Sequence, residues 1–515
     1  WIVGVHPGFI TLSGAQMASR VLALALALAL GANAAKDEDL VDQLPGFDKT
    51  SFKVYSGYLQ VPGPFNLTEY DSLMIHYQFH EAQSSPDTAP VVTWHQGGPG
   101  GSSIYGLYGE MGYFQVDSTG PHTNPYSWNA VANMLYLESP AGSDWEQTGT
   151  GYSYCTKDGE KQKTCSWDDV SQAEAYAHTL NAFFAAFPEY ATNDLYLTGE
   201  SYAGQYLPNI ANWIVENEGA FEPALNLKGM ALGNACWGGT EDEVICNGRN
   251  AEQNDLDMYF GKGLVSKKLY NAAYEACDFP SIRGDGCESA LEAASHAVGA
   301  HNVYDIYDNC DDLGAKLEKA GRSPRWLKNA LRARMDAKDD EARAAIDAEL
   351  AEVAGSDSYP GGYAWGCDQM DLGAAYITRD DVKEALHLGD AGSGFSYRTS
   401  GPASVTLYPS LVKKMRILIY NGDSDDCVPY KGNEEWTTRL ADDGVLTEKS
   451  AWHPWTAGDD SIPAGYATTY TVNDATEDVG EFAFITIRLA GHMVPAFQPR
   501  AAASFFETWI AGGTF

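Results

Sequence analysis

A serine in a glycine-rich turn is the first group in this chain that could act as a nucleophile. Ser201 lies in the hexapeptide GESYAG at residues 199–204, which contains the pattern Gly-x-Ser-x-Gly. A strand-like run precedes it at residues 194–198, and a helix-compatible stretch follows at 206–216. Strand, tight turn and helix form the context of a nucleophile elbow, in which the residue after the serine, Tyr202, offers its N–H to a developing oxyanion. The pattern predicts a catalytic serine at position 201.

A serine hydroxyl needs a histidine base, and the histidine needs a carboxylate that fixes its tautomer. In hydrolases with such an elbow, the carboxylate and then the histidine follow the serine along the chain. An apolar run at residues 416–420 leads into NGDSDD, where Asp423, Asp425 and Asp426 compete. A second run at 482–487 leads into LAGHMVP, which contains His492. The other late histidines are His387, in a helical pattern, and His453, in a loop rich in Trp and Pro.

A second oxyanion donor is expected from an early glycine-rich loop that follows a strand. The run VVTW at residues 91–94 leads into HQGGPGGSS at 95–103. Its glycines allow the backbone to approach a substrate carbonyl closely. The loop is weak as a lone motif, but it fits the elbow and the late Gly-His.

The elements that would position these groups alternate between strands and helices. Besides the runs already named, strands are expected at residues 52–61, 73–79, 133–137 and 227–232, and a helix at 171–187. This alternation predicts an α/β fold of the α/β-hydrolase type, with a mostly parallel central sheet and helices on both faces. The first part of this core is expected at residues 35–234 and the second part at 366–515.

A helical cap is expected between the two parts of the core, at residues 235–365. This segment has no convincing buried strand and should hold three or four amphipathic helices. Residues 316–353 are rich in Ala, Lys, Arg, Asp and Glu, which predicts a solvated helical pair. The cap would lie over the carboxyl ends of the strands, where open α/β sheets bind ligands.

The N-terminal region has the order of a secretory signal. Met17 is the first methionine, and it is followed by Arg20, an apolar run at 21–30 and the small residues of an A-x-A cleavage site. We expect a signal peptide at residues 17–34, and we interpret residues 1–16 as upstream sequence that is not native to the protein. The apolar run is too short to span a bilayer, and we expect no membrane span elsewhere.

The chain has nine cysteines, which can form disulfides if the chain enters an oxidising compartment. Three pairs are close in sequence and could each close a local loop: Cys155 with Cys165, Cys236 with Cys246, and Cys277 with Cys287. Three others remain, at positions 310, 367 and 427, so at least one thiol is free or pairs outside the chain. No CxxC pair occurs, and we expect neither a metal nor a cofactor. The sequon at Asn66 predicts a glycosylation site.

The formal net charge of −37 excludes the strongly basic classes of protein. Nucleic acid is not an expected partner, because contacts to phosphate need a basic face. An enzyme that works at low pH would carry less charge there, since its carboxylates begin to protonate. Simple solubility explains the charge equally well.

The motifs together resemble the serine carboxypeptidase family, which includes cathepsin A, carboxypeptidase Y and the plant serine carboxypeptidase-like enzymes. The resemblance runs in family order from about residue 52 to the C-terminus. The matching segments are YSGYL (55–59), QGGPG (96–100), SWN (127–129), ESPAG (138–142), GESYAG (199–204), DVKEALH (381–387), NGDSD (421–425) and GHMVP (491–495).

The resemblance implies a serine-type carboxypeptidase, a hydrolase that removes C-terminal residues from peptides or proteins through an acyl-enzyme. It assigns Ser201, Asp425 and His492 as the triad, with Asp423 as the alternative carboxylate. The oxyanion donors would be the N–H groups of Gly98 and Tyr202. The implied binding site for the substrate's C-terminal carboxylate consists of Gln96, Gly97, Glu110 and Glu200, and Met493 and Cys427 are implied to line the S1′ or a neighbouring pocket.

Glu110 and Glu200 give a physical reason for an acidic working pH. Two close carboxyls cannot easily both ionise, so at least one pKa should rise. A protonated glutamate donates a hydrogen bond to the substrate carboxylate, whereas an ionised one repels it. We expect kcat/KM for free-acid peptides to fall as the pH rises above about 6.

The chain departs from the family at several positions. Relatives have Cys where this chain has Gly101, bonded to a cysteine that the stretch 395–416 lacks here. Relatives pair the positions of Cys310 and Cys367, which leaves Cys427 as the free thiol. Gln96 replaces the usual Asn and is one methylene longer. Residues 143–149 are extra in a loop that is normally short, and the sequence leaves open whether they form a real loop at the rim of the site or come from an error in the gene model.

Two other functions stay open on the sequence. Some plant relatives transfer an acyl group from sugar esters, and the triad does not separate this chemistry from hydrolysis. A non-catalytic protective or binding partner is the third reading, against which the intact triad argues. The sequence places the chain in the secretory pathway, in a lysosome, a vacuole or outside the cell, and leaves a monomer or a homodimer open.

Overall fold

The computed structural model describes residues 38–117, 119–144, 151–240, 243–308, 313–354, 369–475 and 479–515. The expected signal peptide, the upstream residues 1–16 and most of the insertion at 143–149 lie outside the described residues, as do Cys310 and Cys367.

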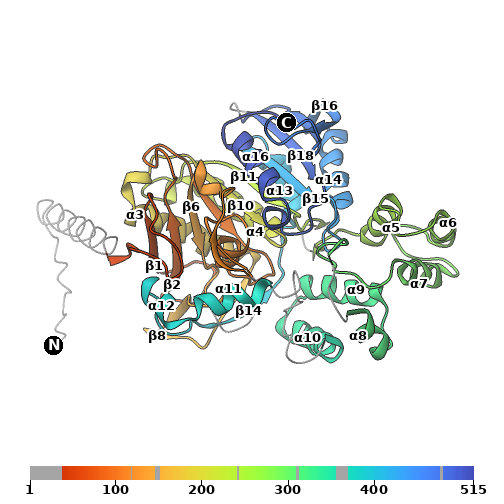
Figure 1. The fold of residues 1–515 in the computed structure, drawn as a ribbon, viewed down its shortest axis with the longest axis horizontal. Coiled ribbons are helices and arrows are strands. Elements are labelled where there is room, and N and C mark those ends of the chain that lie inside the picture. The colour runs from red at the N-terminus through yellow and green to blue at the C-terminus, as the bar shows by residue number, and fades with distance from the viewer. Residues whose placement is uncertain are drawn as a thin grey trace, which may run out of the picture.

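A large central sheet, to which twelve strands of the described chain contribute, carries the fold (Figure 1). Along the sheet the order is β16 (Leu446–Trp455), β17 (Gly465–Val472), β18 (Glu481–Ile487), β15 (Arg416–Gly422), β11 (Leu227–Gly233), β10 (Leu195–Glu200), β3 (Val91–His95), β6 (Asn133–Leu137), β2 (Ser72–His80), β7 (Tyr154–Lys157) and β8 (Glu160–Lys161), and β1 (Val54–Pro62) pairs with β2. The pairs from β18 to β6 are parallel, and those at both ends of the sheet are antiparallel.

Short runs of apolar residues form the parallel centre of the sheet. The sequences of β3 (VVTWH) and β6 (NMLYL) are buried throughout, and β15 and β18 are buried at all but their first residues. Strands covered on both faces are continuously apolar, which is why they were legible in the sequence. The fold class expected from the sequence, α/β with a mostly parallel central sheet and helices around it, is confirmed.

The helices around the sheet come from both parts of the chain. They are α2 (Ile104–Gly109), α3 (Asp169–Ala186), α4 (Ala203–Glu216), α11 (Gln369–Ile377), α12 (Asp380–Ala385), α13 (Ser404–Leu411), α14 (Tyr430–Asp442), α15 (Val494–Phe497) and α16 (Pro499–Ile510). Three small ladders lie outside the large sheet, formed by β4 (Phe114–Asp117) with β5 (Gly120–Thr123), β9 (Thr164–Asp168) with β14 (Gly394–Arg398), and β12 (Gly239–Thr240) with β13 (Glu243–Val244).

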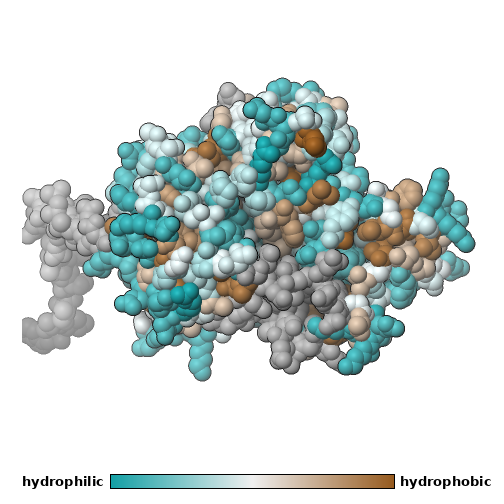
Figure 2. Space-filling view, in the orientation of Figure 1, coloured by the Kyte–Doolittle hydropathy of each residue, from teal (hydrophilic) through white to brown (hydrophobic). Residues whose placement is uncertain are grey.

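A cap of six helices in the described chain projects to one side of the sheet, between β11 and α11 (Figure 1). They are α5 (Ala251–Gly261), α6 (Lys267–Ala276), α7 (Cys287–Val298), α8 (Leu313–Ala320), α9 (Pro324–Met335) and α10 (Asp340–Ala354). Helices α5, α6 and α7 have a small apolar core of their own around Leu256 and Leu291. Figure 2 shows apolar side chains gathered over this tip of the cap, where Phe260 and Ile282 are exposed.

The charged stretch at 316–353 is not the solvated helical pair that its composition predicted. It contributes to three helices, and four of its cations are buried: Lys328, Arg332, Arg334 and Arg343. Composition alone misleads here because several buried cations pair with acidic side chains on other elements, such as Lys328 with Asp255 and Asp426. The expected number of cap helices was also too small.

One late histidine lies in a different element than expected. His453 belongs to β16, the edge strand, and not to a loop; its Nε2 atom lies 2.9 Å from the carbonyl oxygen of Phe515. The strand was missed because its middle residues are polar and largely exposed, so it lacks the apolar run of the central strands.

Candidate active site

Ser201 lies at the turn between β10 and α4, in the strained backbone that a nucleophile elbow requires. Its φ angle is +61°, which is rare for a residue with a side chain. The turn is held by a hydrogen bond from Ser201 N to Gly233 O at 3.0 Å and by one from Cys236 N to Ser201 O at 2.9 Å. Added Cβ atoms at Gly199 and Gly204 would each meet a carbonyl oxygen at 2.4 Å, so both glycines are needed.

Asp425 and His492 meet above the carboxyl ends of β15 and β18. The Nδ1 atom of His492 lies 2.8 Å from Asp425 Oδ2. The carboxylate also accepts hydrogen bonds from the N–H groups of Cys427 at 2.9 Å and Val428 at 3.2 Å, and from Asn234 Nδ2 at 2.7 Å. Both side chains are buried, so Asp425 is fixed from several sides and in turn orients the imidazole.

The alternative carboxylate, Asp423, has a different environment. It forms an ion pair with Lys262 at 3.0 Å and accepts a hydrogen bond from Leu489 N at 2.8 Å. The structure therefore brings Asp425, and not Asp423, to His492.

Burial and the neighbouring carboxylate of Asp425 shift the pKa of His492 in opposite directions. Burial opposes protonation, but the charge and hydrogen bond of Asp425, with a further contribution from Glu200, raise the pKa of His492 above its ordinary value of 6.5. An imidazole with a raised pKa is a stronger base, and it is held protonated at low pH.

The glycine loop after β3 packs directly against the elbow. An added Cβ at Gly97 would lie 2.6 Å from both Ser201 Cβ and Tyr202 N. The backbone N–H groups of Gly98 and Tyr202 donate to no acceptor in the described part of the chain. Two free donors in segments that pack against each other at the elbow are available to bind an oxyanion.

Gln96, Glu110 and Glu200 form a buried polar cluster next to Ser201. The Nε2 atom of Gln96 donates to Glu200 Oε1 at 2.7 Å, and its Oε1 atom accepts from Trp94 Nε1 at 2.8 Å. The longer side chain of Gln therefore still reaches the glutamate. Glu110 and Glu200 are each 1% exposed and interact with each other.

Both glutamates hold a proton more tightly than an exposed carboxyl does. Burial raises the pKa of Glu110 to about 8. Burial, followed by the charge of Glu110, raises the pKa of Glu200 well above its ordinary value. Contacts with Glu200 and Gln96 partly offset this effect on the pKa of Glu110, but burial dominates.

A family model described as serine carboxypeptidase matches residues 45–512, which is nearly the whole chain. The chain belongs to the serine carboxypeptidase family. The lysosomal protective protein of Mus musculus is 30% identical over 538 residues, a match that covers 96% of this chain and 98% of that protein. Serine carboxypeptidase 24 of Arabidopsis thaliana is 30% identical over 497 residues, with 93% of each chain covered.

A solved structure supports the fold of this serine carboxypeptidase. The crystal structure of a prohormone-processing carboxypeptidase from Saccharomyces cerevisiae has a TM-score of 0.58 and 19% identity, and the match covers 92% of this chain and 96% of that one. The protein has the α/β-hydrolase fold and is a serine-type carboxypeptidase, a hydrolase. Within the described residues, no helix is long and apolar enough to cross a membrane, and no cluster of three His, Cys, Asp or Glu side chains could hold a metal.

Disulfides close all three short loops that the cysteine spacing singled out: Cys155–Cys165, Cys236–Cys246 and Cys277–Cys287. Such bridges persist in oxidising compartments and fit the secretory pathway. Cys427 is the free cysteine of the described chain, and it is buried. Burial raises the pKa of its thiol.

Two further candidate residues, Met493 and Asn66, lie in different surroundings. Met493 is 3% exposed and is the N-cap residue of α15, directly after His492. Asn66 is exposed, as a glycosylation acceptor must be, and its backbone N–H donates to Glu174 Oε1 at 2.7 Å.

A buried ionic cluster that the sequence did not reveal joins the cap to the Asp425 loop. Asp426 is 0% exposed and pairs with Lys328 of α9, which also lies 2.8 Å from Asp255 of α5. Tyr259 Oη of α5 and His301 Nε2 each lie 2.8 Å from Asp426 Oδ2. Burial opposes ionisation, but Lys328 and His301 lower the pKa of Asp426 to about 2. The cap thereby holds the residue next to Asp425.

A buried carboxylate that the sequence did not reveal holds the side chain of Tyr202. The buried carboxyl of Asp169 accepts hydrogen bonds from Tyr202 Oη at 3.1 Å, Tyr397 Oη at 2.7 Å and Ser400 N at 2.6 Å. Burial raises the pKa of Asp169 to about 7. Asp169 is the first residue of α3, and two of its partners, Tyr397 and Ser400, are 228 and 231 residues away in the chain, so its role could not be predicted from the local sequence.

Proposed function

We propose that the protein removes the C-terminal residue of peptides and proteins through an acyl-enzyme formed on Ser201. In this proposal His492 is the general base, Asp425 orients it, and the N–H groups of Gly98 and Tyr202 bind the oxyanion. The observation that carries the restriction to a free C-terminus is the buried pair Glu110–Glu200 beside the elbow, contacted by Gln96, in which burial raises both pKa values.

The reaction needs two displacements at the scissile carbonyl. Ser201 Oγ attacks the carbonyl carbon while His492 takes the hydroxyl proton, and the C–N bond then breaks as His492 returns the proton to the leaving amine. A water molecule, deprotonated by the same imidazole, hydrolyses the resulting ester and restores Ser201. The two N–H groups stabilise the negative oxygen in both steps.

The carboxylate of the leaving residue is bound by Gln96, the N–H of Gly97, Glu110 and Glu200. A carboxylic acid that keeps its proton donates a short, strong hydrogen bond to a carboxylate, whereas the ionised pair repels it. A C-terminal amide lacks the charged acceptor, so the pair gives selectivity for the free acid.

The working pH lies between the ionisations of two sets of groups. On the acid side, protonation of His492 removes the base, and its pKa is raised. On the alkaline side, the glutamate pair loses its proton, and the pKa of Glu110 is about 8. We propose activity that extends from acid to neutral pH, with the alkaline decline at a higher pH than the value of about 6 expected from the sequence.

The proposal also includes a substrate pocket, a glycosylation site and a cellular compartment. Met493 and Cys427, which flank the triad in sequence, line the S1′ or a neighbouring pocket. Asn66 carries a glycan. The protein works in a lysosome or vacuole or outside the cell, on peptide or protein substrates, after removal of the signal at residues 17–34.

The decisive experiment compares a peptide that has a free C-terminal carboxylate with its C-terminal amide. We expect kcat/KM for the free acid to be at least about 100-fold higher than for the amide. This ratio corresponds to roughly the free energy of a hydrogen bond to a charged group. Equal hydrolysis of both would indicate a general esterase or endopeptidase and would refute the carboxypeptidase assignment.

Controls separate the remaining functions. Ser201→Ala should abolish both hydrolysis and labelling by a fluorophosphonate, and failure of the native protein to label would support a non-catalytic binding partner. An acyltransferase would form more transfer product than hydrolysis product when a sugar-ester donor and an alcohol acceptor are supplied together.

A further inference from the structure

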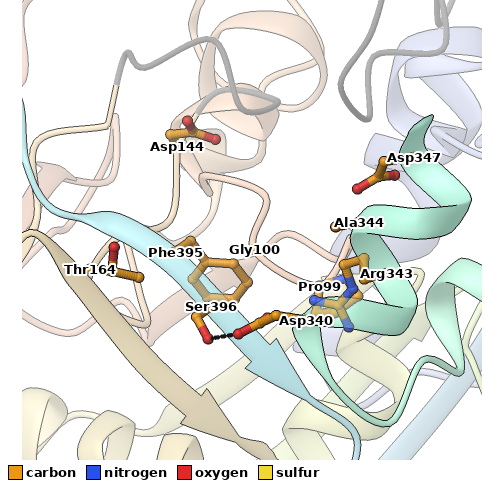
Figure 3. Close-up of a pocket in the computed structure, with 10 residues that line it drawn as sticks. All are labelled: Pro99, Gly100, Asp144, Thr164, Asp340, Arg343, Ala344, Asp347, Phe395 and Ser396. Carbon is orange, nitrogen blue, oxygen red and sulfur yellow. Dashed lines mark hydrogen bonds between the residues drawn. The ribbon is translucent and has the colours of Figure 1, made fainter. Parts of the chain in front are cut away.

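A cavity of about 430 Å³ lies between cap helix α10, the glycine loop and β14 (Figure 3). Pro99 and Gly100, which directly follow the proposed oxyanion donor Gly98, form one wall, and Arg343 of α10 forms another. Its volume is within the range of about 300–1,000 Å³ typical of ligand pockets. A group bound there would lie next to the glycine loop that contacts Ser201.

Arg343 is a buried cation that has no counter-ion among the described residues. It is 7% exposed, and within this part of the chain its Nε and Nη2 atoms have no hydrogen-bond partner. Its guanidinium lies over the ring of Tyr397, 5.9 Å from the centroid, which is a weak compensation for lost hydration. Burial lowers the pKa of Arg343, but a guanidinium remains charged in proteins. A buried unpaired charge is costly, so the site favours an anion that supplies the missing acceptors.

The two carboxylates that α10 contributes to the wall of the cavity have other partners. Asp347 forms its ion pair with Arg334, at 2.6 Å. Asp340 accepts hydrogen bonds from the hydroxyl of Ser396 and from Tyr397 N, at 3.2 Å for the latter. Besides burial, the groups that act on the pKa of Arg343 are Arg334 and the hydroxyls of Tyr202, Tyr206 and Tyr397, and no carboxylate of the described chain is among them. In Figure 3 the arginine extends from α10 toward Pro99.

We propose that this cavity is a side-chain subsite in which Arg343 binds the carboxylate of an acidic residue of the peptide substrate. The proposal rests on the peptidase function above. A carboxylate fits the planar fork of a guanidinium and makes charge-assisted hydrogen bonds with it. Because the whole protein is strongly acidic, a single buried arginine would distinguish glutamate from its neutral isostere by contact and not by long-range attraction.

The occupant is either the side chain of the leaving residue or one on the acyl side of the scissile bond. Both carry the same chemistry, so the test places the acidic residue at each position in turn. Three peptide pairs, identical except for Glu or Gln at the C-terminal residue, the residue before the scissile bond or the one before that, are compared by kcat/KM at a single pH.

For the native enzyme we expect the Glu peptide to be preferred by roughly 10-fold or more at one of the three positions, the size of a hydrogen bond to a charged group. In Arg343→Met the ratio should fall to about one, and in Arg343→Lys it should be partly restored. Arg343→Glu should favour Lys over Gln at the same position. The control Arg322→Met, on the exposed end of the cap, should keep the native ratio, since Arg322 lies outside the cavity.

The native enzyme alone can overturn the proposal, even if every Arg343 variant fails to fold. Hydrolysis of the Gln peptides with a Glu-to-Gln ratio of one at all three positions refutes the acidic subsite and leaves the carboxypeptidase assignment standing. A ratio that stays at its native value in folded Arg343→Met refutes it as well. If no peptide of either set is cleaved, the peptidase function fails and the subsite falls with it.

Discussion

Replacing both buried glutamates by glutamine tests the proposed carboxylate site most directly. In Glu110→Gln/Glu200→Gln the two side chains keep their size and can still donate a hydrogen bond from an amide, but they no longer titrate. Any pH dependence that originates in the pair must therefore disappear, while the limb set by His492 must remain.

The magnitude follows from the pKa of Glu110, which is about 8 instead of its ordinary 4.5. That difference corresponds to roughly 5 kcal/mol between the protonated and ionised forms of a fully buried group. Because the folded state holds the proton more tightly than the unfolded chain, this group stabilises the fold least at high pH. The native protein should lose stability progressively from pH 4.5 to pH 8 relative to the double variant, by up to about 5 kcal/mol if Glu110 titrates alone.

Activity should change above this range, at a pH higher than the pKa of the pair. For native enzyme, the ratio of kcat/KM for a free-acid peptide to that for its amide should fall about tenfold per pH unit above the pKa of the pair. In the double variant this ratio should be constant between about pH 6 and pH 9, because an amide donor does not ionise. Stopped assays at constant ionic strength, with thermal unfolding at each pH, measure both effects.

The control is Glu174→Gln, which changes another fully buried glutamate that accepts two backbone hydrogen bonds far from the site, from Asn66 and Leu67. It should alter stability but leave the pH dependence of the acid-to-amide ratio as in the native enzyme. A native ratio that is flat up to about pH 9.5, or a double variant that keeps the alkaline decline, would refute the role of the glutamate pair.

Three further predictions concern the loop that follows β15. Asp425→Asn should lower kcat by about 10⁴-fold with little change in KM, because the imidazole loses its tautomeric partner, and a loss below tenfold in steady-state assays would exclude this role. Lys328→Met removes the lysine from buried Asp426 and Asp255, which keep only His301 and Arg332 of the described chain as basic partners, and should destabilise the fold by up to about 3–5 kcal/mol in denaturant unfolding; an unchanged midpoint would contradict a buried ion pair. Cys427, whose thiol pKa is raised by burial, should react with iodoacetamide at pH 8 only after unfolding, and fast labelling of native protein would count against the buried position.

Local patterns allowed much of the core to be predicted from the sequence. The elbow at Ser201 combines strand, turn and helix within some twenty residues, so its context is readable without knowledge of the fold. Asp425 and His492 follow apolar strands that are buried on both faces, and the carboxyl ends of parallel neighbours lie on one edge of the sheet. The choice of Asp425 over Asp423 came from the family resemblance, and the 2.8 Å contact with His492 supplies its geometric reason.

The cap was predicted less well because its charges are satisfied across the tertiary structure. Lys328 and Arg332 look like exposed residues of a charged helix, yet both face acidic groups of α5. The local pattern of a helix does not indicate such a pair, because Asp255 lies 77 residues before Arg332 in the chain. The edge strand β16 was also not predicted from the sequence. Most of its residues are exposed, so it lacks the apolar run that marks a buried strand.

The sequence by itself determined which reactive groups the protein has, the order in which they occur and the strand ends that bear them. The family resemblance brought Glu110 and Glu200 into one hypothesis. Only the tertiary structure decided their protonation, because a pKa depends on burial and on charges that approach from distant segments. For the same reason it alone disclosed Arg343, whose placement against the glycine loop and lack of a counter-ion are properties of the packed cap and not of the helix that carries it.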